Sequence, residues 1–319
     1  MKTLNVSWPK TILFACAIFM LPACNSNEPM GKGEAEFQIT DAPCDDASVK
    51  SVFVTVADVK VDGQSISGFA KQTIDLKAYQ AGSTKLLGST QLNAKTYSNV
   101  TLVLDTDTDA SGNAPGCYVL TMDNTKYRLS SSGTIAVTAN KSWSVLTSAK
   151  STMIIDFDLR KSIRAMTDQS IRYNFVSNDN LQASVRLVSQ AKAGTISGTY
   201  SEQTSSNADK IIVYAYKKGT FNASTETQAQ GDDAIFFKNA ITSAEVKAGF
   251  SSNTFKIAFL EEGDYELHFA AYNKDSGSDR FIFQTMLKSQ TTANGSVGDF
   301  VTVQSGITIS ISSVINGTI

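Results

Sequence analysis

Hydrophobic and polar residues alternate with a period of two along most of the chain after residue 34. Val52, Val54 and Val56 share one parity, whereas Val59 and Val61 take the other. Side chains on a strand point alternately to its two faces, so this pattern predicts one long strand interrupted by a bulge.

Further alternating segments predict strands at 73–78, 97–104, 118–122, 134–138, 143–146, 152–159 and 181–188. Turn-forming residues such as Asp62-Gly63 and Ser132-Gly133 separate them. Short strands divided by turn signals are typical of a β-sandwich. The one helical stretch expected in this half is a turn or two within 160–166.

A second series of strands begins after a natural boundary at 190–193. It comprises 194–199, 211–216, 255–259, 263–272, 281–286 and 307–311. No long segment has the helical period. The pattern therefore predicts an all-β fold with two tandem β-sandwiches, immunoglobulin-like or transthyretin-like, at 34–190 and 191–319.

The first 23 residues have the build of a secretory signal peptide. Lys2 and Lys10 precede an uncharged apolar run at 11–21, and the sequence Leu21-Pro22-Ala23-Cys24 follows. This resembles a bacterial lipobox, although Pro22 is unusual there. The resemblance implies that Cys24 is acylated as the first residue of the mature protein and that 24–33 form a tether. The alternatives are an ordinary signal peptide and an uncleaved anchor, but the run is shorter than the ~20 apolar residues that span a bilayer.

The charge balance argues against nucleic acid as a partner. The chain has 28 basic and 30 acidic side chains, and removal of residues 1–23 takes away two lysines and no acid. A protein that binds phosphates needs a face rich in Lys and Arg. Neither the balance nor any basic run supplies one.

Two cysteines remain for the folded part, because Cys16 lies in the apolar run and Cys24 is assigned to lipid. Cys44 and Cys117 of an exported protein most simply form a disulfide. Two free buried thiols, or half of a metal site, are the alternatives. A metal is disfavoured because no CxxC spacing exists and the single histidine, His268, is distant in sequence.

Acidic residues supply two further candidates for chemistry. Asp105, Asp107 and Asp109 alternate as calcium ligands often do, yet a solvated loop is the simpler interpretation, since the Gly and Glu of an EF-hand loop are missing. Asp156 and Asp158 share one face of a strand and could act at a glycosidic bond. The structural alternative places them on the outward face, paired with Arg160 or Lys161. We expect no metal and no cofactor.

Aromatic residues and the histidine are assigned structural roles. Trp143, Tyr214, Tyr216 and Tyr272 could form a platform for sugars, but sandwich cores commonly hold such rings. His268 has no second His and no Cys nearby in sequence, and no GxSxG elbow is present. We therefore expect no enzyme.

A run of motifs in the first half resembles a known family. Phe37-Gln38-Ile39-Thr40-Asp41-Ala42-Pro43 comes first, and Ile155-Asp156-Phe157-Asp158-Leu159-Arg160-Lys161-Ser162-Ile163 comes last. In this order they resemble the bacterial lipoprotein family of domain of unknown function 4382, over about 34–188. The resemblance implies an exported β-sandwich and carries no established activity. The second half more loosely resembles transthyretin-like or carboxypeptidase-regulatory-like modules, which usually act as spacers or binding supports.

Together these features predict a lipid-anchored envelope protein that binds or displays without catalysis. The expected partners are the membrane, through the N-terminal lipid, and a glycan or another envelope protein, through the polar loops 105–116 and 217–233. Asn25 after Cys24 favours the outer membrane. A structural part of a surface or periplasmic assembly, and a glycoside hydrolase that uses carboxylates, are the alternative functions.

Overall fold

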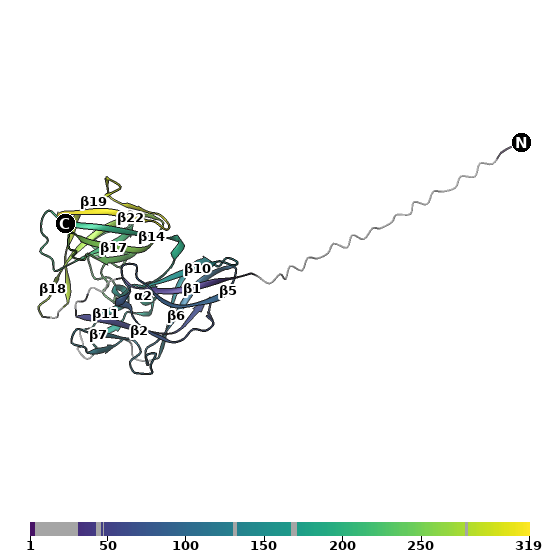
Figure 1. The fold of residues 1–319 in the computed structure, drawn as a ribbon, viewed down its shortest axis with the longest axis horizontal. Helices are drawn as coiled ribbons and strands as arrows, with labels where there is room; N and C mark the ends of the chain where they lie inside the picture. The colour runs from purple at the N-terminus through teal and green to yellow at the C-terminus, as the bar shows by residue number, and fades with distance from the viewer. Residues whose placement is uncertain (4–30, 43–45, 47, 130–132, 167–170, 278–279) are drawn as a thin grey trace. The chain divides into compact units, whose positions relative to one another are not determined.

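The computed structural model describes residues 1–3, 31–42, 46, 48–129, 133–166, 171–277 and 280–319. Gly31–Ile319 form one compact unit (Figure 1). Cys24 and nearly all of the predicted signal peptide lie outside the described residues, so both stay predictions. In the part of the chain that the structure describes, no helix is long and apolar enough to cross a membrane.

The N-terminal half is a sandwich of two sheets. The first sheet has the order β13-β10-β1-β5, in which β1 and β10 run parallel. Its strands are β1 (Lys32–Thr40), β5 (Lys85–Asn93), β10 (Lys150–Phe157) and β13 (Val185–Ser189). The first strand therefore begins two residues before the predicted start of the domain.

The second sheet has seven strands in the order β8-β7-β2-β6-β9, with β3 and β4 also paired to β2. Its strands are β2 (Val49–Val61), β3 (Gln64–Ser65), β4 (Gln72–Asp75), β6 (Thr96–Asp105), β7 (Tyr118–Thr121), β8 (Lys126–Arg128) and β9 (Thr134–Ser144). The pairing of β2 with β6 shifts register between Val56 and Asp58, so the predicted bulge is confirmed. The inward positions of both sheets share one hydrophobic core, in which Phe37, Leu102 and Leu104 are fully buried.

Short elements connect the sheets of this sandwich. They are η1 (Leu76–Ala78), α1 (Leu159–Ser162), β11 (Ile163–Ala165), β12 (Tyr173–Phe175), α2 (Asn178–Ala183) and η3 (Gln190–Lys192). The expected helix within 160–166 is right only for its first turn, because Ile163 to Ala165 pair with β12 as a strand. The strand expected at 181–188 is likewise shorter, since α2 occupies its beginning.

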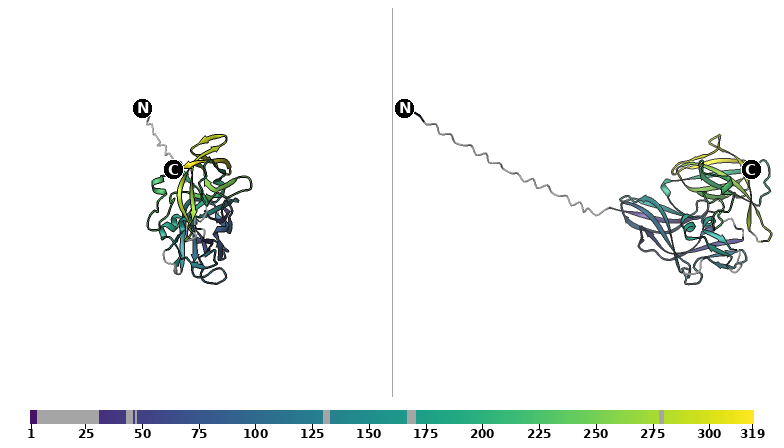
Figure 2. Two further views of the ribbon diagram at one scale, coloured as in Figure 1. Left: turned by 90° about the vertical axis from the view of Figure 1, so that its left-hand side faces the viewer. Right: turned by 180° about the vertical axis from the view of Figure 1, so that it is seen from behind.

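The C-terminal half is one continuous sheet of nine strands. Seven of them follow the order β16-β15-β18-β19-β22-β14-β17, and the other two, β20 and β21, pair with β19 and β18. Figure 2 gives two further views of it, in green to yellow. Its strands are β14 (Ala193–Glu202), β15 (Lys210–Lys217), β16 (Thr242–Glu245), β17 (Asn253–Glu261), β18 (Gly263–Lys274), β19 (Phe281–Ala293), β20 (Ser296–Gly298), β21 (Val301–Val303) and β22 (Thr308–Thr318). A bridge between Lys247 and Thr254 brings the two ends of the sheet together, around a second core. The predicted all-β class is confirmed.

The polar segment after β15 folds onto the C-terminal sheet and is not a free display loop. It contains α3 (Ala223–Glu226), and the carboxylate of Glu226 is fully buried. That carboxylate accepts hydrogen bonds from the Tyr216 hydroxyl (2.7 Å) and from the backbone and side chain of Asn239 (3.0 and 2.5 Å). Tyr214, Tyr216 and Tyr272 are buried beneath this segment, in a core with Phe237, so they form no open platform for sugars.

We predict that Glu226→Ala lowers the free energy of unfolding by about 2 to 4 kcal/mol, because it leaves the buried donors of Tyr216 and Asn239 without an acceptor. Glu262→Ala removes an exposed carboxylate and serves as the control, with an expected change within about 0.5 kcal/mol. Urea unfolding followed by far-UV circular dichroism measures both. Equal stability of the two variants would mean that the segment is not part of the folded core.

Candidate binding site

A group of charged side chains joins the two halves of the compact unit. We call it the charge clamp, and it consists of Asp156, Asp158, Arg160, Lys161 and Arg186. Its centre is Asp158, whose Oδ1 accepts a hydrogen bond from the Arg160 amide and so caps α1. Its Oδ2 accepts from Arg160 Nη2 at 2.8 Å. Arg160 Nη1 then donates to the backbone carbonyls of Phe236 and Phe237, each at 2.8 Å. A side chain of the N-terminal sandwich thus binds the backbone of the C-terminal half.

Two further cations repeat this arrangement. Lys161 Nζ donates to the carbonyl of Ala240 and lies 3.6 Å from Asp158 Oδ2. Burial lowers the pKa of Lys161 to about 8, against the opposing effect of Asp158. Arg186 lies 2.6 Å from Asp156 Oδ2 through Nη2, and its Nη1 donates to the carbonyl of Phe259 at 2.7 Å. Arg160, Lys161 and Arg186 together complete the clamp.

A negative charge of the C-terminal half binds the N-terminal half in the same way. It is the carboxylate of Asp233, in the segment after α3. Its Oδ2 accepts hydrogen bonds from the Ser177 amide and hydroxyl and from Asn180 Nδ2. Its Oδ1 lies 2.9 Å from Arg164 Nη1. Burial alone would raise the pKa of Asp233, but these hydrogen bonds outweigh it and the pKa lies below its usual value.

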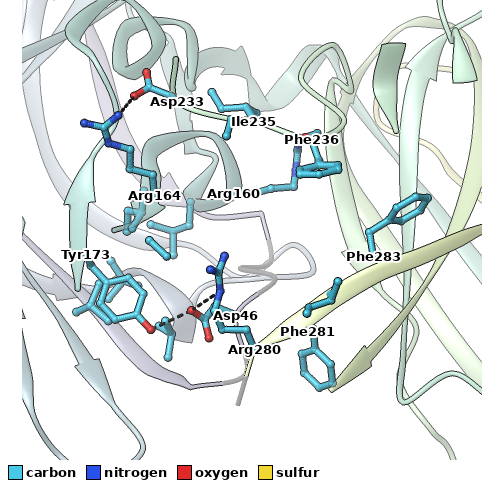
Figure 3. A pocket seen from close by; sticks show the side chains of 18 of the residues that line it. Asp46, Arg160, Arg164, Tyr173, Asp233, Ile235, Phe236, Arg280, Phe281 and Phe283 are labelled. Carbon is cyan, nitrogen blue, oxygen red and sulfur yellow. Dashed lines mark hydrogen bonds and ion pairs between the residues drawn. The ribbon is translucent and has the colours of Figure 1, made fainter. Parts of the chain in front are cut away.

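Beside the clamp, a cavity of about 440 Å³ opens between the two halves. Figure 3 shows Arg164 reaching towards Asp233 on one side and Arg280 lying next to Asp46 on another, with Phe281 and Phe283 along the C-terminal wall. The volume falls within the range usual for small-molecule sites, and a mixed apolar and polar lining is typical of them. We call this cavity the junction pocket.

The N-terminal wall of the junction pocket holds a small polar network. Asp46 Oδ1 accepts from the amide (2.8 Å) and hydroxyl (2.6 Å) of Ser48, and its Oδ2 accepts from the Tyr173 hydroxyl at 2.9 Å. Burial raises the pKa of Tyr173, and the negative charge of Asp46 adds to this, so the phenol stays neutral. Arg280, from the opposite wall, lies 3.7 Å from Asp46.

The structure corrects the expected surroundings of Asp156 and Asp158. Neither lies on an outward, solvated face: they are 3% and 4% exposed. The expected pairing of Asp158 with Arg160 and Lys161 is confirmed, whereas Asp156 pairs with Arg186. The outer face of their strand is covered by the C-terminal half.

The candidate calcium ligands are not brought together. Asp105 pairs with Lys71 at 2.8 Å, Asp107 pairs with Arg128 at 3.0 Å, and Asp109 accepts from the amides of its own loop. Among the described residues, no group of three or more His, Cys, Asp or Glu side chains could hold a metal ion.

Cys117 is a free, buried thiol in this structure. Its Sγ accepts from the Thr55 amide at 3.4 Å and donates to the Asp105 carbonyl at 3.3 Å. Burial raises the pKa of Cys117 to about 12. Cys44 lies outside the described residues, so the disulfide between the two stays a prediction. His268 stacks on Phe221 in the C-terminal half, away from the junction pocket.

Sequence analysis missed the junction pocket because its lining comes from segments far apart in the chain. Arg164, Tyr173 and Arg280 carry no spacing motif. The apolar run from Met153 to Ile155 does offer a signal, since a strand with hydrophobic residues at both parities is typically covered on both faces.

Residues 32–176, slightly less than half of the chain, match the family model described as Domain of unknown function (DUF4382). This confirms the resemblance of the N-terminal half to that family. Comparison with curated proteins gives no match.

Several solved structures share low similarity with the chain. The Bacillus anthracis TIE protein is 11% identical with a TM-score of 0.19, over 89% of this chain, which spans only 34% of that protein. The major pilin T-13 of Streptococcus pyogenes is 8% identical with a TM-score of 0.20, over 90% of this chain and 99% of the pilin. The minor pilin GBS52 of Streptococcus agalactiae is 10% identical with a TM-score of 0.21, over 89% and 96%. TM-scores this low establish no shared function.

We predict that Arg160→Met lowers the free energy of unfolding by about 3 to 5 kcal/mol, because Asp158 then keeps a buried charge without its closest partner. Arg280→Met is the matched control, since that side chain is 51% exposed and its ion pair is long; we expect a change below about 1 kcal/mol. Chemical denaturation of both variants measures the difference. If Arg160→Met were as stable as the control, the clamp would not hold the junction.

Proposed function

We propose that this protein is lipid-anchored in the bacterial cell envelope and binds a partner in the junction pocket without transforming it. The observation that carries the proposal is the pocket itself, about 440 Å³ in volume and lined by arginine, aspartate and aromatic side chains from both halves. Fixed walls favour binding, since a preformed site has little ordering entropy to lose. The partner we propose is a glycan or a short segment of another envelope protein.

The state of the carboxylates supports binding over hydrolysis. A retaining or inverting glycosidase needs two carboxyl groups that face the substrate. Asp156 and Asp158 are instead buried in ion pairs with Arg186 and Arg160. Asp46 and Asp233, which do line the pocket, are each held by several hydrogen-bond donors. We therefore assign them to the architecture of the pocket.

The N-terminal anchor and the domain boundaries belong to the same proposal. We propose acylation of Cys24, a tether that ends near residue 33, and placement in the outer membrane. The N-terminal sandwich then extends to about residue 190, and the C-terminal half, proposed as a transthyretin-like module, supplies the second wall of the pocket.

For the anchor, we predict that Cys24→Ala releases the protein from the membrane fraction or leaves its signal peptide uncleaved. Firm anchoring needs two or more acyl chains, each contributing about 0.8 kcal/mol per buried methylene, and this variant has no site for them. Fractionation and mass spectrometry of the N-terminus read out both effects, with Cys16→Ala as the control. Unchanged processing together with membrane retention would contradict the anchor.

For the pocket, we predict that Ala165→Trp, which places a large ring in the cavity, reduces attachment to immobilised glycans or envelope fragments at least about tenfold. Ala70→Trp, at an exposed position of the same sandwich outside the pocket, should attach as the unmodified protein does. Thermal unfolding shows whether both variants remain folded. Turnover of a glycoside by the purified protein, lost in Asp156→Asn without unfolding, would replace this proposal by the hydrolase.

A further inference from the structure

The charged groups around the junction pocket leave hydrogen-bond donors, and not acceptors, available for a ligand. Within the described residues, the one ionic contact of Arg280 joins its Nε to Asp46 Oδ2 at 3.7 Å, which is longer than a hydrogen bond. Arg164 uses Nη1 for Asp233, and its Nε is buried without a hydrogen bond to any described residue. Both guanidinium groups therefore retain N–H donors.

The acids of the lining, in contrast, have their oxygens occupied. Asp46 accepts from both polar groups of Ser48 and from the Tyr173 hydroxyl. Asp233 accepts three hydrogen bonds in addition to its contact with Arg164. A ligand that brings acceptor oxygens consequently finds free donors, whereas a ligand that brings donors finds acceptors already in use.

The charge of the lining limits the ligand to a single negative charge. Three arginines and two aspartates line the pocket, but Arg160 is neutralised by Asp158 just outside the lining, so the pocket carries no large excess of positive charge. Asp46 lies close to Arg280, so a second negative charge on the ligand would be repelled at short range. A carboxylate fits this balance better than a doubly charged phosphate, and it matches the planar fork of an arginine.

The C-terminal wall is apolar and partly open. Phe236 and Ile282 are 37% and 49% exposed, and Phe281 and Phe283 stand beside them along the pocket. Aromatic rings that keep part of their surface free offer a flat face for another ring or for the C–H face of a sugar. The ligand therefore needs an apolar or ring-shaped part next to its charge.

We propose that the junction pocket recognises a carboxylate attached to a ring-sized apolar group, with Arg280 and Arg164 on the carboxylate and the Phe236, Phe281 and Phe283 wall on the ring. This inference rests on the proposed function and names the class of ligand. An acidic sugar and the carboxyl terminus of a peptide share this chemistry.

The test uses two matched pairs of probes, in each of which one member has a carboxylate and the other has a neutral group at the same position. Phenyl glucuronide is compared with phenyl glucoside, and N-acetylphenylalanine with its amide, by NMR titration against the mature protein in detergent. We expect the carboxylate of at least one pair to bind at least about tenfold more tightly than its neutral mate, as charge-assisted hydrogen bonds allow. The pair that shows the preference identifies the source as sugar or peptide.

Arg280→Met should reduce the affinity for the carboxylate to that of the neutral mate. Lys288→Met removes a positive charge from an exposed position of β19, the strand that directly follows Arg280, and should leave the preference intact. If carboxylate and neutral probes bind equally, and Ala165→Trp weakens both, the inference fails while the pocket stands. If none of the probes binds, both the inference and the proposed function fail.

Discussion

The arrangement of this protein depends on three largely buried cations at the contact between its two β-rich halves. Removing a charged group from water costs several kcal/mol unless oppositely charged or polar partners surround it. Arg160, Lys161 and Arg186 find those partners in two aspartates of their own sandwich and in backbone carbonyls of the other half. Because these carbonyls occupy fixed positions in the C-terminal half, the need to pair the cations sets how the two halves pack against each other.

This packing of the two halves creates the junction pocket. Arg160 lines the pocket, and its Nη1 donates to the backbone carbonyls of Phe236 and Phe237, which holds the aromatic wall next to the N-terminal network. Asp233 holds the other side through Ser177 and Asn180. The pocket is thus a consequence of the clamp, and a change in the clamp should alter binding without touching the ligand.

The sequence was sufficient for the strands and for the bulge in β2, since both follow from the alternation of residues within one segment. It was not sufficient for Asp156 and Asp158. Asp156 in β10 lies opposite the buried Ile155 and Phe157, as predicted, and Asp158 directly follows the strand as the N-cap of α1, but the C-terminal half covers that face. Local alternation predicts which face of a strand a side chain lies on, but not whether another part of the chain covers that face. The polar composition that suggested a display loop at 217–233 misled for the same reason, because Glu226 and Asp233 find their partners far away in sequence.

Calorimetric unfolding of the mature protein tests most directly whether the clamp joins the two halves. We predict one transition whose calorimetric and van't Hoff enthalpies agree, because two halves that share buried charges unfold together. Two separate transitions in the unmodified protein, or a calorimetric enthalpy well above the van't Hoff value, would show that the halves fold independently and would contradict the account.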